Sequence, residues 1–325
     1  MKRKLLRFLW VLFVAVVLPT VTRDARAGGA ALEFAAPEAL GVVHIDADEL
    51  RKTRLMGEIE KEIRGDSEAK KTLEKLKAEA GLNPFKDISG VTVVFGADVL
   101  KRPNTPEFVA IIEGKFDEAK LLKMLSDADK GGPAPAPGSG PQTAPKVATK
   151  AHELKTGPNG PFYLLDKGRI ALAFRGKKLI FGAAKLVARA LEKHNPKAAL
   201  AAVRAPVEGD MLWLAVKTNE DARSRLSMVG SDTLQTLSLG LSVPAGGKLQ
   251  LHAHYGDPAQ AAELGKALQD WLSTADKDAV VKQFGLTVLL SKVLVKVSQG
   301  DLDVHVELTE KDLDGVRKII TPMIH

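Results

Sequence analysis

The chain has 325 residues, no cysteine and a formal net charge of +7. Six of its 47 basic residues but only one of its 40 acidic residues lie in the first 27 positions, which leaves 41 basic and 39 acidic side chains, a net charge of +2, on the remaining 298 residues. A balance so near zero gives no electrostatic footprint for nucleic acid. The lack of cysteine excludes disulfides, thiolate metal sites and cysteine nucleophiles.

The N-terminal segment has the pattern of a secretory signal peptide. MKRKLLR supplies a basic start, Phe8 to Leu18 is an apolar run, and Ala25 and Ala27 are small residues at the −3 and −1 positions of a cleavage site. The run is shorter than the roughly twenty apolar residues that span a bilayer, and no later stretch reaches that length. We predict a signal peptide over residues 1–27, cleaved after Ala27, no transmembrane segment after cleavage, and a periplasmic or secreted location in a Gram-negative envelope.

The first half of the remaining chain shows strand and helix patterns in alternation. The stretch 41–52 predicts an apolar strand followed by a helix that Asp46 and Asp48 cap. A polar helix is expected from Ser67 to Ala80, ended by Gly81 and Pro84.

Two stretches interrupt this pattern. Residues 131–145, GGPAPAPGSGPQTAP, are too rich in Pro, Gly and Ser to bury a core, so we predict a disordered insertion there. Residues 195–209 are the better boundary between two parts of the chain. We therefore divide the mature sequence into a first unit over 28–200 and a second unit over 206–325.

The two units resemble each other in the order and type of their elements. The matched stretches are 41–52 with 210–223, 88–96 with 234–244, 107–125 with 249–268, and 162–174 with 287–297. This match sets Gly114 against Gly256, which places His252 and His254 opposite Ala110 and Ile112. Identity is low, so two unrelated stretches with common patterning are the alternative. We favour an internal duplication because element order and element type both agree.

Local chemistry supports the elements of the second unit. Asp257 followed by Pro258 predicts a helix start, and Leu268 and Trp271 on that helix are expected to pack inward. Gly300-Asp301 predicts a turn between two β-rich runs. The fold class expected is α+β, with two similar units, each a mainly antiparallel sheet with helices packed on one face.

Three histidines are the only candidate site residues, and they suggest a metal site. His252 and His254 are two apart on a predicted strand, so they share a face. His305 lies on the polar face of another predicted strand, with Asp303 and Glu307. Imidazoles with nearby carboxylates suit zinc or copper. The sequence does not show whether the two strands adjoin, and an ordinary strand without any cofactor is the stronger interpretation.

No catalytic motif with a recognisable spacing is present: the chain has no G-x-G-x-x-G, P-loop, H-E-x-x-H or G-x-S-x-G. The phrases GLNPFKDISGVTVVFG (81–96) and FVAIIEGKFD (108–117), together with the leader and the repeated units, resemble uncharacterised exported bacterial proteins of the domain-of-unknown-function kind. That resemblance implies export and no known activity.

The function expected is that of an exported, non-catalytic envelope or periplasmic protein with a binding surface or cleft for an unknown protein or small ligand. One alternative is a metal-binding protein using His252, His254 and His305. The other is a hydrolase with unrecognised carboxylates, because no spacing rule identifies a carboxylate pair in a sequence.

Overall fold

The computed structural model describes residues 31–35, 38–96, 108–130, 153–157, 160–165, 168–192, 200–220, 223, 232–242, 247–278, 281–282 and 287–312. The predicted signal peptide and the predicted insertion at 131–145 lie outside these residues.

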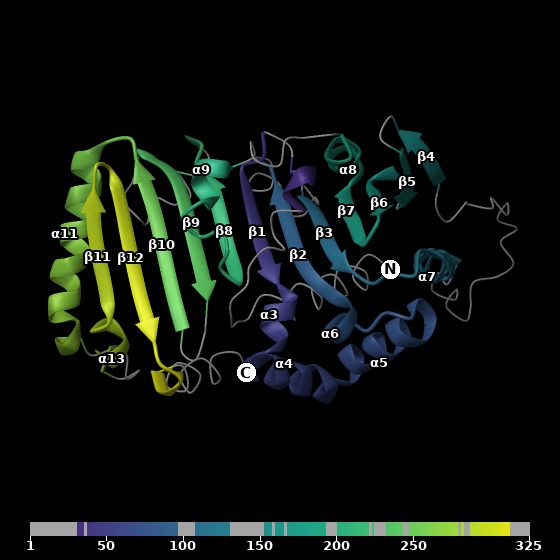
Figure 1. Cartoon of the computed structure of the whole chain (residues 1–325), viewed down its shortest axis with the longest axis horizontal. Helices are drawn as coiled ribbons and strands as arrows, with labels where there is room; N and C mark the ends of the chain where they lie inside the picture. Colours follow the sequence, from purple (N-terminus) through teal and green to yellow (C-terminus); the bar gives the residue numbers. More distant parts are fainter. Residues whose placement is uncertain are drawn as a thin grey trace, which may run out of the picture.

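Runs of two to four strands are separated by helices along most of the chain (Figure 1). The strands are β1 (Gly41–Asp46), β2 (Ile88–Phe95), β3 (Phe108–Gly114), β4 (Glu153–Gly157), β5 (Gly160–Leu165), β6 (Ile170–Arg175), β7 (Lys178–Ala183), β8 (Leu212–Lys217), β9 (Leu234–Ser242), β10 (Gly247–Tyr255), β11 (Val293–Ser298) and β12 (Asp301–Leu308). The longer helices are α3 (Ala47–Arg51), α4 (Arg54–Gly65), α5 (Ser67–Lys75), α7 (Glu118–Lys130), α8 (Ala184–Ala190) and α11 (Pro258–Thr274), and the short ones are α6 (Pro84–Asp87), α9 (Ala201–Arg204) and α13 (Thr287–Leu290).

All twelve strands belong to one sheet, in the order β11-β12-β10-β9-β8-β1-β2-β3-β7-β6-β5-β4. Every ladder between these strands is antiparallel. The prediction of an α+β fold with a mainly antiparallel sheet is therefore confirmed. The prediction of one sheet per unit is wrong, because β1 pairs with β8 and joins the two parts edge to edge.

The strand order is the same on both sides of the β1–β8 junction. Outward from the junction it reads β1-β2-β3-β7-β6 on one side and β8-β9-β10-β12-β11 on the other. β2 has a bulge opposite Glu113 and Gly114, and β9 has one opposite His254 and Tyr255. A bulge adds one residue to one strand of a pair, so it fixes the register on each side.

This common bulge corrects the match made from sequence. It sets Gly114 against Tyr255 instead of Gly256, so that His254 corresponds to Glu113 and His252 to Ile111. A slip of one residue moves every side chain of a strand to the other face. The residues that the sequence match placed opposite the histidines, Ala110 and Ile112, therefore lie on the wrong face.

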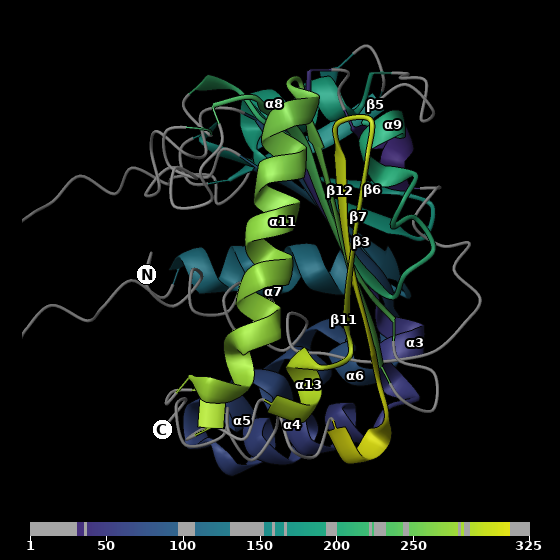
Figure 2. The same cartoon turned by 90° about the vertical axis from the view of Figure 1, so that its left-hand side faces the viewer.

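Helices cover both faces of the sheet, which corrects the prediction of a single covered face. α7 packs Leu122 in a cluster with Ile112, and α11 packs Ala261 in a cluster with Ala253. The cross-strand register puts these two helices on the same face, called here the α11 face. α8 and α9 pack on the opposite face, called the α9 face. Figure 2 shows α7 and α11 on one side of the strands and α9 on the other.

Helix starts follow the expected capping chemistry. The Asp46 carboxylate accepts from the backbone N–H of Glu49 at 2.9 Å, and Asp257 accepts from Ala259 at 2.9 Å. Both satisfy a donor that has no partner within the helix. The predicted polar helix begins at Ser67 and continues through a π-helical turn to Ala80, and Gly81 ends it in the left-handed conformation, with φ of 64°. Helices α3 to α6 gather at one end of the sheet (Figure 1).

The largest core lies on the α9 face and extends from the first half across the β1–β8 junction. Ile111, Ile180 and Val187 of α8 are completely buried there, and Trp213 of β8 is 1% exposed. Trp271, which the sequence predicts to pack inward from α11, is 44% exposed instead.

Candidate functional site

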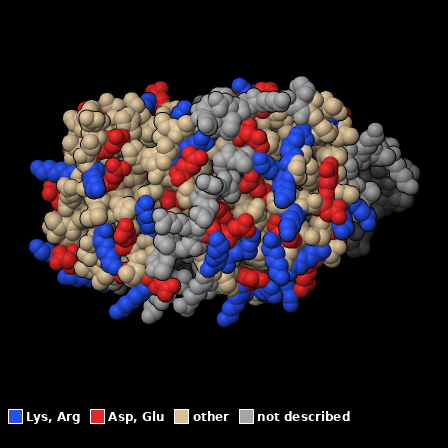
Figure 3. All heavy atoms as spheres, viewed as in Figure 1, with Lys and Arg blue, Asp and Glu red and all other residues tan. Residues whose placement is uncertain are grey.

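The α9 face carries polar side chains where it crosses β9 to β12, and this region is called the polar face. Its side chains, besides Leu294, are Thr236, Ser238, Ser242, Lys248, Gln250, His252, His254, Lys296, Ser298, Asp301, Asp303, His305 and Glu307. Figure 3 looks onto this face and shows acidic and basic side chains interspersed with uncharged surface at its left. A strand face with this composition is built to meet water or a polar partner.

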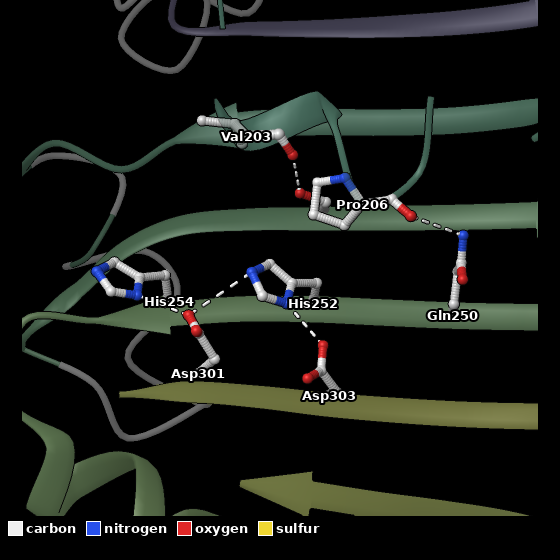
Figure 4. Close-up of polar contacts among 8 residues, drawn as sticks. Val203, Pro206, Gln250, His252, His254, Asp301 and Asp303 are labelled. Carbon is white, nitrogen blue, oxygen red and sulfur yellow. Dashed lines mark hydrogen bonds and ion pairs between the residues drawn. The ribbon is translucent and has the colours of Figure 1, made fainter. Parts of the chain in front are cut away.

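Four of these side chains form a chain of polar contacts, called the His–Asp ladder (Figure 4). His254 Nδ1 lies 2.7 Å from Asp301 Oδ1, and His252 Nδ1 lies 2.6 Å from Asp303 Oδ1. Asp301 Oδ1 is also 3.7 Å from His252 Nε2, so its carboxylate lies between the two imidazoles. The His252 side chain is 21% exposed and that of Asp303 is 49% exposed. Solvent or a ligand can therefore reach the ladder.

A tight turn places the two aspartates opposite the two histidines. β11 and β12 are joined by Gln299 and Gly300, with φ of 50° and 92°, which corrects the predicted turn at Gly300-Asp301. In a two-residue hairpin the flanking residues exchange both backbone hydrogen bonds, so Asp301 and Asp303 direct theirs toward β11. Their pairs with β10 are then the non-hydrogen-bonded kind, in which facing side chains approach most closely.

A second polar network fixes β9 and β10 to the chain that follows α9. Gln250 Nε2 donates to Pro206 O at 3.0 Å and to Asp210 Oδ2, and Ser242 Oγ donates to Asp210 Oδ1 at 2.5 Å. The Asp210 carboxylate occupies the space above Gly240, where an added Cβ would lie 1.9 Å from Oδ2. This network lies next to the His–Asp ladder, because Gln250 and His252 are two residues apart on the same face of β10.

His305, the third predicted metal ligand, shares the polar face but does not join the ladder. It lies opposite Gln250 on β10, and its Nε2 is 3.4 Å from Glu307 Oε1 on its own strand. The structure thus brings His252 and His254 together with two aspartates, and leaves His305 beside them. Among the residues that the structure describes, no three His, Asp or Glu side chains are already spaced to hold a metal ion.

Ser238, His252 and Asp303 lie in line on three adjacent strands, which is the residue set of a serine hydrolase. Ser238 is completely buried, however, and its hydroxyl donates to Val203 O of α9. A nucleophile needs its oxygen exposed to substrate and hydrogen bonded to the base. The line of three residues therefore lacks the geometry of a catalytic triad.

A buried histidine lies on the same face of the first half. His44 is 2% exposed, its Nδ1 is 2.8 Å from Thr92 Oγ1, and its ring lies 5.5 Å from that of Trp213. Burial lowers the pKa of His44 from 6.5 to about 4, because water is not there to stabilise the charged form. His44 is therefore neutral at pH 7 and packs as a core residue.

Two carboxylates flank Gly90 beside this histidine. Asp46 and Glu113 are the cross-strand neighbours of Gly90, and Glu113 Oε2 and His44 Cε1 both border the space that a Cβ on Gly90 would take. Burial raises the pKa of both carboxyl groups, and Lys178 partly offsets the rise for Glu113. Asp46 caps α3, so its carboxylate already has a structural role.

Sequence reasoning missed Asp301 as a site residue, although a signal for it was present. Residues 301 to 307 alternate polar and apolar side chains, as do 248 to 254, so pairing these two strands would have put carboxylates opposite imidazoles. The sequence does not state which strands pair.

No family model and no curated protein matches this chain. One solved structure with a similar course of the chain is described as "Structure of crystal form I of TP0453"; it is 10% identical, with a TM-score of 0.41, and the match covers 93% of this chain and 99% of that chain. A TM-score this low carries no argument about fold or function. Within the described residues, no helix combines the length and the apolar character needed to cross a bilayer.

Proposed function

We propose that this protein is an exported, non-catalytic binding protein of the bacterial envelope or periplasm, and that the polar face is its contact surface. The observation that carries the proposal is the contrast between two strand pairs at the same place in the strand order. β3 and β7 bury their α9-face residues Ile111 and Ile180 completely, whereas β10 and β12 present the partly exposed His252 and Asp303 there. The fold does not need the polar set.

Export is supported by the leader and by where the folded chain begins. Residues 1–27 have the basic, apolar and small-residue regions of a signal peptide. Leu32, five positions after the expected cleavage site at Ala27, is completely buried in the core with Val42. Cleavage there would leave every described core residue on the mature chain.

An internal duplication explains why matching strand positions carry apolar side chains in one half and polar side chains in the other. The repeated strand order and the repeated bulge support two copies of one unit joined through β1 and β8. After duplication, one copy keeps its core and the other is free to change the same positions into a surface. A hydrolase is less well supported, because Ser238 is buried and Asp46 caps a helix.

Site-specific photocrosslinking in the exporting cell tests the proposal. Benzoylphenylalanine replaces Lys296 or Glu307, both exposed on the polar face, and a matched control replaces Lys266, exposed on α11. We expect an adduct at the first two positions and none at the third, and the adduct mass distinguishes a protein partner from a small molecule. Equal adducts at all three positions, or none at any, would overturn the proposal.

The export step is tested separately by the mass of the periplasmic protein. The expected N-terminal residue is Gly28, and retention of residues 1–27 on a cytoplasmic protein would contradict the localisation.

A further inference from the structure

We propose that residues 313–325 complete a C-terminal helix that packs across the α11 face of the second half, over Leu241, Leu249 and Val306. These C-terminal residues lie outside the described part of the chain. The inference goes beyond the proposed function, because it concerns the side of the sheet opposite the polar face. Three observations carry it: an apolar row without a described cover, the place where the described chain ends, and the sequence that follows.

The α11 face carries a row of apolar side chains on β9, β10, β12 and β11. The cross-strand register places Leu241 beside Leu249, which neighbours Val306, and Val306 beside Val293. Leu249 is 37% exposed, and the other three side chains are partly exposed. Within the described chain, none of the four belongs to a packed apolar cluster. These residues, called the apolar row, would gain free energy if a further apolar surface covered them.

The described chain ends beside the apolar row, in the first turn of a helix. After β12, Thr309 Oγ1 accepts from the backbone N–H of Asp312 at 3.3 Å, and the Asp312 carboxylate accepts from the backbone N–H of Thr309 at 2.6 Å. This reciprocal pair is a capping box, which marks the start of a helix. The Asp312 carboxylate also pairs with Lys292, directly before β11. The helix therefore begins at the β11–β12 end of the row.

The sequence after Asp312 has the pattern of an amphipathic helix. Its apolar side chains recur at intervals of three and four residues and form one stripe, made of Leu313, Val316, Ile319 and Ile320. Asp314 and Lys318 fall on the opposite side, and Pro322 does not fit a helix interior. A helix this short owes its stability to the packing of its apolar stripe. The pattern therefore predicts a helix over 310–321 that needs an apolar surface to cover.

The helix and the apolar row agree in length. A helix over 310–321 is about 18 Å long, because each residue adds about 1.5 Å. Neighbouring strands lie about 4.8 Å apart, so a helix that crosses them passes about one strand every three residues. Starting beside β12, it would set Leu313 over Val306, Val316 over Leu249, and Ile320 over Leu241. The stripe then meets the row side chain by side chain.

The polar face does not suit this helix. In the first half, α8 follows β7 and packs Val187 in the cluster that holds Ile180, on the α9 face. The same course after β12 would set the apolar stripe against the His–Asp ladder, where Leu294 is the apolar side chain at hand. Burying imidazoles and carboxylates under an apolar helix leaves them without partners, which is costly. The chemistry of the two faces therefore directs the helix to the α11 face and leaves the polar face open.

Disulfide formation in the full mature chain tests the inference, since the protein has no cysteine of its own. The probe is the double variant Leu249→Cys/Val316→Cys, oxidised with copper phenanthroline and detected by the mass of the linked peptides. One control, Leu249→Cys/Lys318→Cys, uses the opposite side of the helix, and the other, His305→Cys/Val316→Cys, uses the polar face. A disulfide needs Cα atoms within about 7 Å, so the probe should form its intramolecular bond at least about 10-fold faster than either control.

Maleimide labelling of the single variant Leu249→Cys gives a second readout. Adding Val316→Asp and Ile320→Asp should speed the labelling at least about 10-fold, because charges on the stripe release the helix from the apolar row. Adding Asp314→Ala and Lys318→Ala instead, on the opposite side of the helix, should leave the rate unchanged. Circular dichroism checks that each variant is folded.

Three results would overturn the inference. A faster disulfide in the polar-face control would place the helix over the His–Asp ladder. A disulfide between two chains would identify a second copy of the protein as the occupant of the apolar row. A labelling rate at position 249 that the charged substitutions do not change would show that the row is open to a different partner.

Discussion

The strand pairs β3/β7 and β10/β12 occupy the same place in the strand order of the two halves, but they carry different side chains on the α9 face. On the α9 face, Ile111 and Ile180 pair in the first half, where His252 and Asp303 pair in the second. The bulges beside both pairs lie at matching places in the register, so the same strand pairing carries different side chains in the two halves. The comparison shows that the two halves share register and strand order. It also shows that the position is core in the first half, where α8 covers it, and surface in the second half.

The largest effect should come from exchanging the facing residues between halves. Ile180 is completely buried, so Ile180→Asp places an unpaired charge in the core and should cost at least about 3 kcal/mol of unfolding free energy. The reciprocal Asp303→Ile, at a half-exposed position, should change stability by less than about 1 kcal/mol. Urea unfolding of both variants measures the asymmetry, and similar costs would erase the distinction between the halves.

The buried histidine of the first half should make stability depend on pH. The pKa of His44 is lowered from 6.5 to about 4, so the unfolded chain binds more protons between these values and stability falls as pH decreases through this window. The loss from His44 between pH 7 and pH 5 is about 2 kcal/mol. Asp46 and Glu113 act in the opposite sense, because raised carboxyl pKa values let the folded state bind protons first.

The double variant His44→Phe/Thr92→Val separates these contributions. It keeps a ring against Trp213 and removes both polar partners of the hydrogen bond. Its urea-unfolding free energy should decline less than that of the parent on going from pH 7 to pH 5. An identical decline in the two proteins would show that His44 does not cause the pH dependence of stability.

Gly240 sharpens the comparison because the corresponding residue in the first half, Val94, has a side chain. Asp210 occupies the space above Gly240, and Gly240→Ala should cost about 1–3 kcal/mol by overpacking. Gly57→Ala in α4, where a Cβ meets nothing within 4 Å, should instead stabilise by about 0.5–1 kcal/mol. Thermal unfolding of the two variants gives the contrast, and a neutral Gly240→Ala would show that Asp210 moves freely.

The smallest effect should be the energetic coupling within the ladder itself. A double-mutant cycle on His252→Ala and Asp303→Ala should give a coupling below about 1 kcal/mol, because both side chains are partly exposed. Such a value means that the ladder is dispensable for stability. A coupling of several kcal/mol would show that the ladder stabilises the pairing of β10 with β12.

Much of the fold follows from local sequence signals. Asp46 and Asp257 begin helices as expected. The joining of two units into one sheet was not predictable, because nothing local in 41–46 or 212–217 states that these strands pair. The burial of Trp271 failed for a related reason: helical spacing gives a face, but a helix at the edge of a sheet leaves part of that face exposed.

The site was predictable only in part. The spacing of His252 and His254 put them on one face, whereas their carboxylate partners depended on β10 lying beside β12. The one-residue error in matching the halves came from Gly114 and Gly256, which resemble each other in sequence while the bulge register pairs Gly114 with Tyr255. A bulge changes residue count without leaving a composition signal, so only the register reveals it.

Cysteine labelling tests most directly that equivalent positions are covered in one half and open in the other. The chain has no cysteine of its own, so Ile180→Cys and Asp303→Cys each report one position. Under native conditions, maleimide should label the cysteine at 303 about as fast as one introduced at the exposed Lys266, and the cysteine at 180 at least roughly 100-fold more slowly, since that requires opening of the core. Equal protection at 180 and 303 would contradict the account.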